Sequence, residues 1–262
     1  MSIDTRELNI NGRRARVLES GRGKPLLLLH AFPLSADLWR PQLEAPPDGW
    51  RIIAPDLKMA DGSSPSMDEY AAGVEAVAAS LALDNPVVGG LSMGGYVIFA
   101  LLRRARLSIR ALVLADTRAE ADTDEGRANR KKMIALAEAE GAAGIAREMV
   151  PKLLGQTTTR QRPEVVATVR ALIEANSPQA ITTALQAMMH RPDSTPLLAT
   201  IDVPTLVIVG EEDGLTPPPN SESLHRGIRG SRLERVPEAG HLSSLERPDV
   251  FNEALDGFLP GL

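Results

Sequence analysis

The chain has 262 residues and a net charge of −5, and 43% of its residues are hydrophobic, which suits one soluble α/β domain or a domain with one sizeable insertion. The acidic balance argues against a nucleic-acid-binding surface, and the lack of cysteine excludes disulfides, thiol catalysis and cysteine-ligated metals. The polar segment 1–20 has no apolar core typical of a signal sequence, and no apolar run approaches the ~20 residues that span a bilayer. We therefore expect a soluble, cytoplasmic protein without nucleic-acid or membrane partners.

The strand signals begin with an alternating segment at 7–20, centred on Asn11-Gly12, a pair typical of hairpin turns, which predicts an antiparallel pair. In five later segments the apolar residues are continuous rather than alternating, and turn residues bound them: 25–32, 51–56, 86–92, 111–117 and 204–213. Continuous apolar strands are buried on both faces, as in a parallel sheet covered by helices. Segment 231–238 alternates and predicts a last strand near the edge.

Helical patterns separate these strands. Ser66 and Glu69 form a capping box before a helix over 67–83, the segment 92–104 predicts an apolar helix, and Pro248 begins the final helix. Between residues 118 and 200 no further strand pattern occurs. Helical patterns run there roughly over 122–140, 142–154, 163–176 and 178–190. We expect a core domain of residues 1–117 and 201–262, with a helical cap of residues 118–200 over the carboxyl edge of the sheet.

The segment VVGGLSMGGY at 87–96 sets one serine among glycines directly after an apolar run. Its pentapeptide GLSMG fits the pattern G-x-S-x-G between a predicted strand and a predicted helix, which is the context of a nucleophile elbow. Small neighbours keep such a strained turn free of clashes. The alternative is a serine that only caps a helix in a glycine-rich turn.

A serine hydroxyl is a weak nucleophile unless a base takes its proton, and that base needs an orienting acid. Among the histidines, His241 lies in a glycine-flanked loop between the last predicted strand and the last helix, where a base can reach Ser92. Asp213 follows the last buried strand and is the favoured acid. Asp116 also ends a strand and is the alternative acid, although a capping or hinge role suits it better.

These segments resemble α/β-hydrolases of the small, capped serine-esterase type, a group that includes cofactor-free perhydrolases. The resemblance covers essentially the whole chain and rests on LLLLHAFP, GLSMGG, VGEEDGLTPP and EAGHLSSLERP, in the order typical of the family. It implies a mostly parallel eight-stranded sheet with helices on both faces and an inserted four-helix cap. It also implies that Ser92 is the nucleophile, His241 the general base and acid, and Asp213 the orienting carboxylate, with no metal or cofactor.

The segment HAFP at 30–33 resembles the oxyanion-hole segment of this family. The resemblance implies that the backbone N–H groups of Phe32 and Met93 face the developing oxyanion, where losing one donor typically costs ~10²–10³ in rate. Ala31 replaces the usual glycine, so the loop has to avoid a backbone conformation that only glycine adopts easily. A second departure is segment 55–64, which lacks the glycine-spaced pattern common in relatives.

The expected substrate is a small to medium, uncharged ester or lactone. Apolar side chains from the loop after the first central strand and from the cap are expected to line its acyl pocket: Pro33, Leu34, Met133, Leu136, Leu153 and Met188. Methionines let such a pocket adapt its shape.

Three other functions stay open. A carbon–carbon bond hydrolase of the meta-cleavage type shares this triad, and Arg147, Lys152 and Arg191 could bind its diacid substrate. A hydrolase-fold receptor keeps the triad but turns over slowly, and a perhydrolase reaction would be a side activity of the acyl-enzyme. Epoxide hydrolases and haloalkane dehalogenases are disfavoured because they use an aspartate where this chain has Ser92.

Overall fold

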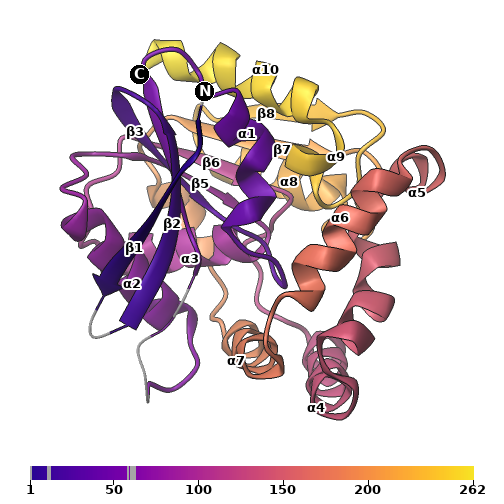
Figure 1. Cartoon of the computed structure of the whole chain (residues 1–262). Helices are drawn as coiled ribbons and strands as arrows, with labels where there is room; N and C mark the ends of the chain where they lie inside the picture. Colours follow the sequence, from indigo (N-terminus) through magenta and orange to yellow (C-terminus); the bar gives the residue numbers. More distant parts are fainter. Residues whose placement is uncertain (1, 11–12, 58, 60–62) are drawn as a thin grey trace.

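The computed structural model describes residues 2–10, 13–57, 59 and 63–262. Within these residues, eight strands form one sheet in the order β1-β2-β4-β3-β5-β6-β7-β8 (Figure 1). The strands are β1 (Asp4–Ile10), β2 (Arg13–Gly21), β3 (Lys24–Leu29), β4 (Trp50–Pro55), β5 (Val87–Leu91), β6 (Ala111–Ala115), β7 (Thr205–Gly210) and β8 (Arg232–Val236). β1 pairs with β2 and β2 with β4 in antiparallel fashion, and the other described pairs are parallel. The mostly parallel sheet that opens with an antiparallel pair is thereby confirmed.

The apolar runs form the centre of the sheet. β5, β6 and β7 are buried along their whole length, as the continuous pattern predicted. The alternating strand β8 lies at the edge. The predicted turn at Asn11-Gly12 lies outside the described residues, but Ile10 and Arg13 on either side are paired in the register that a two-residue turn requires.

Helices cover both faces of the sheet. They are α1 (Arg40–Glu44), α2 (Met67–Ser80), α3 (Met93–Arg104), α8 (Pro218–Gly227), α9 (Ser243–Glu246) and α10 (Pro248–Phe258), with short 3-10 helices η1 (Ala36–Trp39), η2 (Thr195–Thr200) and η3 (Leu259–Gly261). Figure 1 shows α1 and α10 on one face, and α2, α3 and α8 on the other. The predicted helix start is confirmed, because Ser66 is the N-cap of α2 and its Oγ accepts the N–H of Glu69 at 3.2 Å.

Residues 118–200, all of which are described, hold helices and no strand. We call them the helical insertion; its elements are α4 (Asp124–Leu153), α5 (Gln156–Gln161), α6 (Pro163–Glu174) and α7 (Pro178–Met189). Gly141 has non-helical angles (φ 66°, ψ −161°) and divides α4 in two, at the glycine where the sequence predicted a break. The short α5 was not predicted. That the insertion is a separate cap domain stays a prediction.

The carboxyl edge of the sheet brings the segments of interest together. The chain leaves β5 at Ser92, β6 at Asp116 and β7 three residues before Asp213, and these strands are neighbours in the sheet. In Figure 1 the insertion lies beside the sheet, at the right and lower right. No helix in the described part of the chain is long and apolar enough to cross a membrane.

Candidate active site

Ser92 stands on a sharp turn between β5 and α3. Its backbone angles, φ 53° and ψ −109°, lie in a region that residues other than glycine rarely adopt. Two hydrogen bonds support the turn: Ser92 N–H donates to the Ala115 carbonyl at 2.9 Å, and the Thr117 hydroxyl donates to the Ser92 carbonyl at 2.8 Å. The geometry matches the predicted elbow.

The glycines around Ser92 are required by close backbone approach. A Cβ on Gly90 would lie 2.4 Å from the Gly94 carbonyl carbon, and a Cβ on Gly94 would lie 2.2 Å from the Leu29 carbonyl oxygen. Both distances are far below van der Waals contact, and backbone atoms cannot move aside cheaply. The turn therefore has no room for side chains at these two positions.

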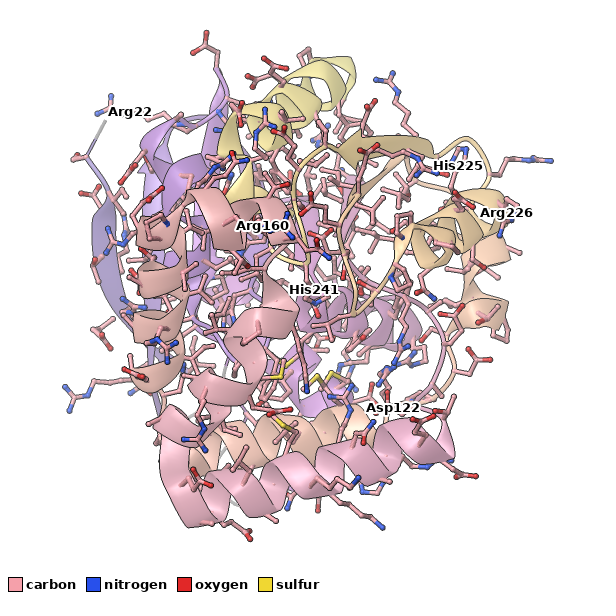
Figure 2. All side chains as sticks on the ribbon, turned by 90° about the vertical axis from the view of Figure 1, so that its right-hand side faces the viewer. Arg22, Asp122, Arg160, His225, Arg226 and His241 are labelled. Carbon is pink, nitrogen blue, oxygen red and sulfur yellow. The ribbon has the colours of Figure 1, made fainter. Side chains whose placement is uncertain are left out.

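Ser92, His241 and Asp213 form one hydrogen-bonded row. Ser92 Oγ lies 2.8 Å from His241 Nε2, and His241 Nδ1 lies 2.8 Å from Asp213 Oδ2. All three residues are at least 91% buried, and Figure 2 shows His241 at the centre of the molecule. Thr216 Oγ1 donates to Asp213 Oδ2 at 2.7 Å and lies 3.2 Å from His241 Nδ1. The arrangement can take a proton from the serine hydroxyl.

The charges of the row support one another. Burial opposes ionisation of both groups, yet the His241 imidazole holds the pKa of Asp213 below its ordinary value. Conversely, burial lowers the pKa of His241, but the nearby Asp213 carboxylate outweighs it and raises that pKa above 6.5. The imidazolium that forms when His241 takes a proton is thus stabilised by Asp213.

Asp116, the alternative acid, makes hydrogen bonds that connect elements of the fold and makes none to His241. Its carboxyl oxygens accept the N–H of Gly210 at 2.9 Å and the hydroxyl of Ser243 at 2.5 Å. Burial and the neighbouring Asp213 charge raise the pKa of Asp116 to about 8. Asp116 thus connects the ends of β6 and β7 with α9 and makes no hydrogen bond to His241, which fits the hinge role favoured by the sequence.

A buried carboxyl that the sequence did not single out holds the His241 loop. Glu246 Oε1 accepts the N–H groups of Gly240 and Leu242 at 3.0 and 3.1 Å, and Oε2 accepts the N–H of Gly155 at 2.8 Å. His241 N–H also donates to the carbonyl of Leu153 at 3.0 Å. The helical insertion is therefore attached directly to the segment that carries the histidine. Residue type gives no signal for this role, because a glutamate is rarely fully buried.

Phe32 and Met93 present unpaired amides near Ser92. Among the described residues, neither backbone N–H donates to another protein group. His30 shapes the loop: its Nε2 accepts the N–H of Leu57 at 2.9 Å, so Nδ1 carries the proton and donates to the Ala31 carbonyl at 2.9 Å. Ala31 is not among the residues with positive φ, so the loop avoids the glycine conformation.

The row opens into a cavity of about 360 Å³ between the sheet edge and the helical insertion. Of the predicted pocket residues, Met133, Leu153 and Met188 line it, together with Phe32. Pro33 and Leu34 line a separate hollow of about 50 Å³ that also contacts Phe32 and Met93.

Leu136, also predicted to line the pocket, does not line the main cavity. It lies on the first half of α4 and faces Gly144 on the second half.

The second departure from the family pattern was segment 55–64. Its residues 58 and 60–62 lie outside the described residues, and Met59 between them is buried.

The same cavity has charged walls that sequence reasoning largely missed. Its charged lining side chains are Arg118, Asp122, Arg130, Lys132, Glu148 and Lys152. Of the three basic residues considered from the sequence, Lys152 lines the cavity and Arg191 contacts Asp122 behind the wall, whereas Arg147 is exposed and pairs with Glu140. Among the described residues, no group of three or more His, Cys, Asp or Glu side chains could hold a metal ion.

Comparison with known proteins identifies the fold family. A family model described as the alpha/beta hydrolase fold matches residues 24–248. The solved structure of a thermophilic esterase from Thermogutta terrifontis, with malate bound, is 35% identical and has a TM-score of 0.91, with 98% of each chain covered.

Two curated relatives are similar in sequence over most of their length. A pimeloyl-[acyl-carrier protein] methyl ester esterase from Neisseria meningitidis is 29% identical, over 91% of this chain and 93% of the relative. The 3-oxoadipate enol-lactonase 2 of Acinetobacter baylyi is 25% identical, over 89% of this chain and 88% of the relative. The chain belongs to the α/β-hydrolase family.

Proposed function

We propose that the protein is a serine hydrolase that cleaves carboxylic esters or lactones through an acyl-enzyme intermediate. The observation that carries the proposal is the row in which Ser92 Oγ, the His241 imidazole and the Asp213 carboxylate are joined at 2.8 Å each. The esterases and the enol-lactonase among its relatives support the same reaction class.

In the proposed first half-reaction, Ser92 Oγ attacks the carbonyl carbon of the ester while His241 Nε2 takes the hydroxyl proton. The N–H groups of Phe32 and Met93 face the oxyanion of the tetrahedral intermediate. The intermediate collapses with cleavage of the bond to the leaving oxygen, which receives the proton from His241. An ester of Ser92 remains.

In the second half-reaction, water attacks the acyl carbon as His241 takes one of its protons. Collapse breaks the bond to Ser92 Oγ, which His241 reprotonates, and the carboxylic acid leaves. We propose that the helical insertion acts as a cap in both steps, because Met133, Leu153 and Met188 enclose the cavity above the row.

The test is hydrolysis of 4-nitrophenyl esters, from acetate to decanoate, by the wild type and Ser92→Ala. Ser221→Ala is the matched control, because Ser221 is a buried serine on α8 away from the cavity. The proposal expects turnover in the wild type and the control and its loss in Ser92→Ala. Equal rates in all three proteins remove Ser92 as nucleophile, and no turnover in any of them favours carbon–carbon bond hydrolysis or a receptor.

A further inference from the structure

Three arginines surround one buried carboxylate beside the catalytic cavity. Arg118, in the link from β6 to α4, donates to Asp122 Oδ1 at 3.3 Å, and Arg191, after α7, donates to the same oxygen at 2.6 Å. Arg130 on α4 donates to both carboxylate oxygens. Figure 2 shows Asp122 at the start of the long helix α4. We call Arg118, Asp122, Arg130 and Arg191 the arginine cluster.

The arginine cluster carries more positive than negative charge. Burial opposes ionisation of Asp122, but the surrounding arginines hold its pKa below the ordinary value, so it is a carboxylate at neutral pH. One carboxylate stands against three guanidinium groups, and Arg118 Nε is buried without any acceptor among the described residues. A buried donor with no acceptor costs free energy that an incoming anion can recover.

This excess charge faces the same cavity as Ser92. Arg118, Arg130 and Asp122 line the cavity with Ser92 and His241, and the exposed Lys132 adds a further cation. The other carboxyl group of the lining, Glu148, is already paired with Lys152.

Arg191 keeps the cluster in place. Its guanidinium carbon lies 4.1 Å from the ring centre of Tyr96, which follows Ser92 by one turn of α3 and also lines the cavity. The arginine cluster is thereby held at a fixed position relative to the serine, which suits a substrate with two groups at a set separation.

We propose that the arginine cluster binds an ionised carboxylate of the substrate, so that the preferred substrate is an ester or lactone with a second, free carboxylate, such as the half-ester of a small dicarboxylic acid. The planar guanidinium fork of Arg118 matches a carboxylate, and the bound carboxylate takes no part in bond breaking. This inference rests on the proposed function and replaces the uncharged substrate that the sequence suggested.

The experiment compares monomethyl with dimethyl esters of succinate, glutarate and adipate. We expect kcat/KM of the wild type to be at least about tenfold higher for the monoester of the best-fitting acid than for its dimethyl ester, since hydrogen bonds to charged groups are strong. Arg118→Gln is expected to lower this ratio about tenfold, and Arg118→Lys to restore part of it. Arg170→Gln removes an exposed arginine of α6 that does not line the cavity, and is expected to keep the wild-type ratio.

A second readout needs no turnover of the half-ester and no variant. Free glutarate is expected to inhibit dimethyl ester hydrolysis by the wild type competitively, and glutaramide to inhibit far less. If the wild type hydrolyses dimethyl esters through Ser92 but neither prefers monoesters nor responds to glutarate, the inference is overturned while the proposed function stands. Inhibition by inorganic phosphate without inhibition by glutarate also overturns it. Dimethyl ester hydrolysis that survives in Ser92→Ala overturns the proposed function instead.

Discussion

Asp213 is fixed before any substrate arrives. Its Oδ1 accepts the N–H groups of Leu215 and Thr216 at 2.8 and 3.0 Å, while Oδ2 faces His241 and the Thr216 hydroxyl. The carboxylate cannot turn away from His241 without breaking several of these bonds. A turn directly after β7 therefore sets the orientation of the proposed base.

The two buried aspartates at the sheet edge are expected to respond differently to the same substitution. Asp213→Asn leaves the side chain's shape but removes the charge that orients and stabilises His241, and is expected to lower kcat by about 10⁴. Asp116→Asn is expected to change kcat far less, because Asp116 makes no hydrogen bond to His241 and its raised pKa of about 8 leaves it largely protonated at neutral pH. Ester hydrolysis by both purified variants checks this, and a reversed order would make Asp116 the orienting acid.

The pH dependence of the reaction follows from His241. The imidazole must be neutral to take the serine proton, and Asp213 raises its pKa above 6.5, so kcat/KM is expected to fall as the pH drops through that raised value. The residual activity of Asp213→Asn is expected to fall at lower pH than that of the wild type, because the raising charge is gone. A pH–rate profile of both proteins measures the shift; coincident acid limbs would contradict it.

At the scale of elements, one loop joins the helical insertion to His241, the proposed base. Glu246, at the end of α9, accepts N–H groups from both sides of His241 and from Gly155 in the link between α4 and α5. There is no space at this junction, because a Cβ on Gly155 would lie 2.8 Å from the Gly240 nitrogen. A movement of the insertion would therefore displace the His241 loop directly, because no other element lies between them.

Glu246→Gln tests this connection. An amide group offers one acceptor oxygen in place of two, so at least one buried N–H loses its partner, and the free energy of unfolding is expected to fall by about 1–3 kcal/mol. We also expect kcat to fall, because the His241 loop loses support. Urea unfolding measures the first effect, and Glu253→Gln, an exposed position on α10, is the control, expected within about 0.5 kcal/mol of the wild type. Equal stability of the two variants would show that the connection does not matter.

At the scale of the whole molecule, Asp116 makes stability depend on pH. The unfolded chain loses the Asp116 proton near its ordinary pKa of 3.8, whereas the folded protein keeps it up to about 8. The folded state therefore binds more protons in this window, and the contribution of Asp116 to the free energy of unfolding decreases as the pH rises. Urea unfolding between about pH 5 and pH 8 is expected to show a smaller decrease for Asp116→Asn than for the wild type; parallel decreases would contradict this.

Much of this molecule follows from local patterns in its sequence. The apolar runs predict the strands, Ser66 predicts the start of α2, and Gly141 predicts the division of α4, because each signal lies within a few residues of the feature. The sequence also singled out Ser92 and Asp213, because Ser92 directly follows a buried strand, Asp213 follows another by three residues, and each sits in a recognisable motif.

The charged wall of the cavity could not be predicted in this way. Arg118 and Arg130 lie four and eight residues from Asp122, but Arg191 follows Asp122 by 69 residues and reaches it only through the tertiary fold. Single charges on helices usually face solvent, so their residue types gave no sign of convergence. Glu246 was missed because its three partners are backbone groups from two separate segments.

Covalent labelling of the intact protein tests most directly whether Ser92 is the nucleophile. Diethyl 4-nitrophenyl phosphate transfers a diethylphosphoryl group to an activated serine oxygen and releases 4-nitrophenolate. We predict that mass spectrometry finds one such group on each wild-type chain, on the peptide that contains Ser92, that esterase activity disappears in proportion, and that Ser92→Ala takes up none. Labelling at another residue with the same loss of activity, or ester hydrolysis by Ser92→Ala at the wild-type rate, would contradict the account.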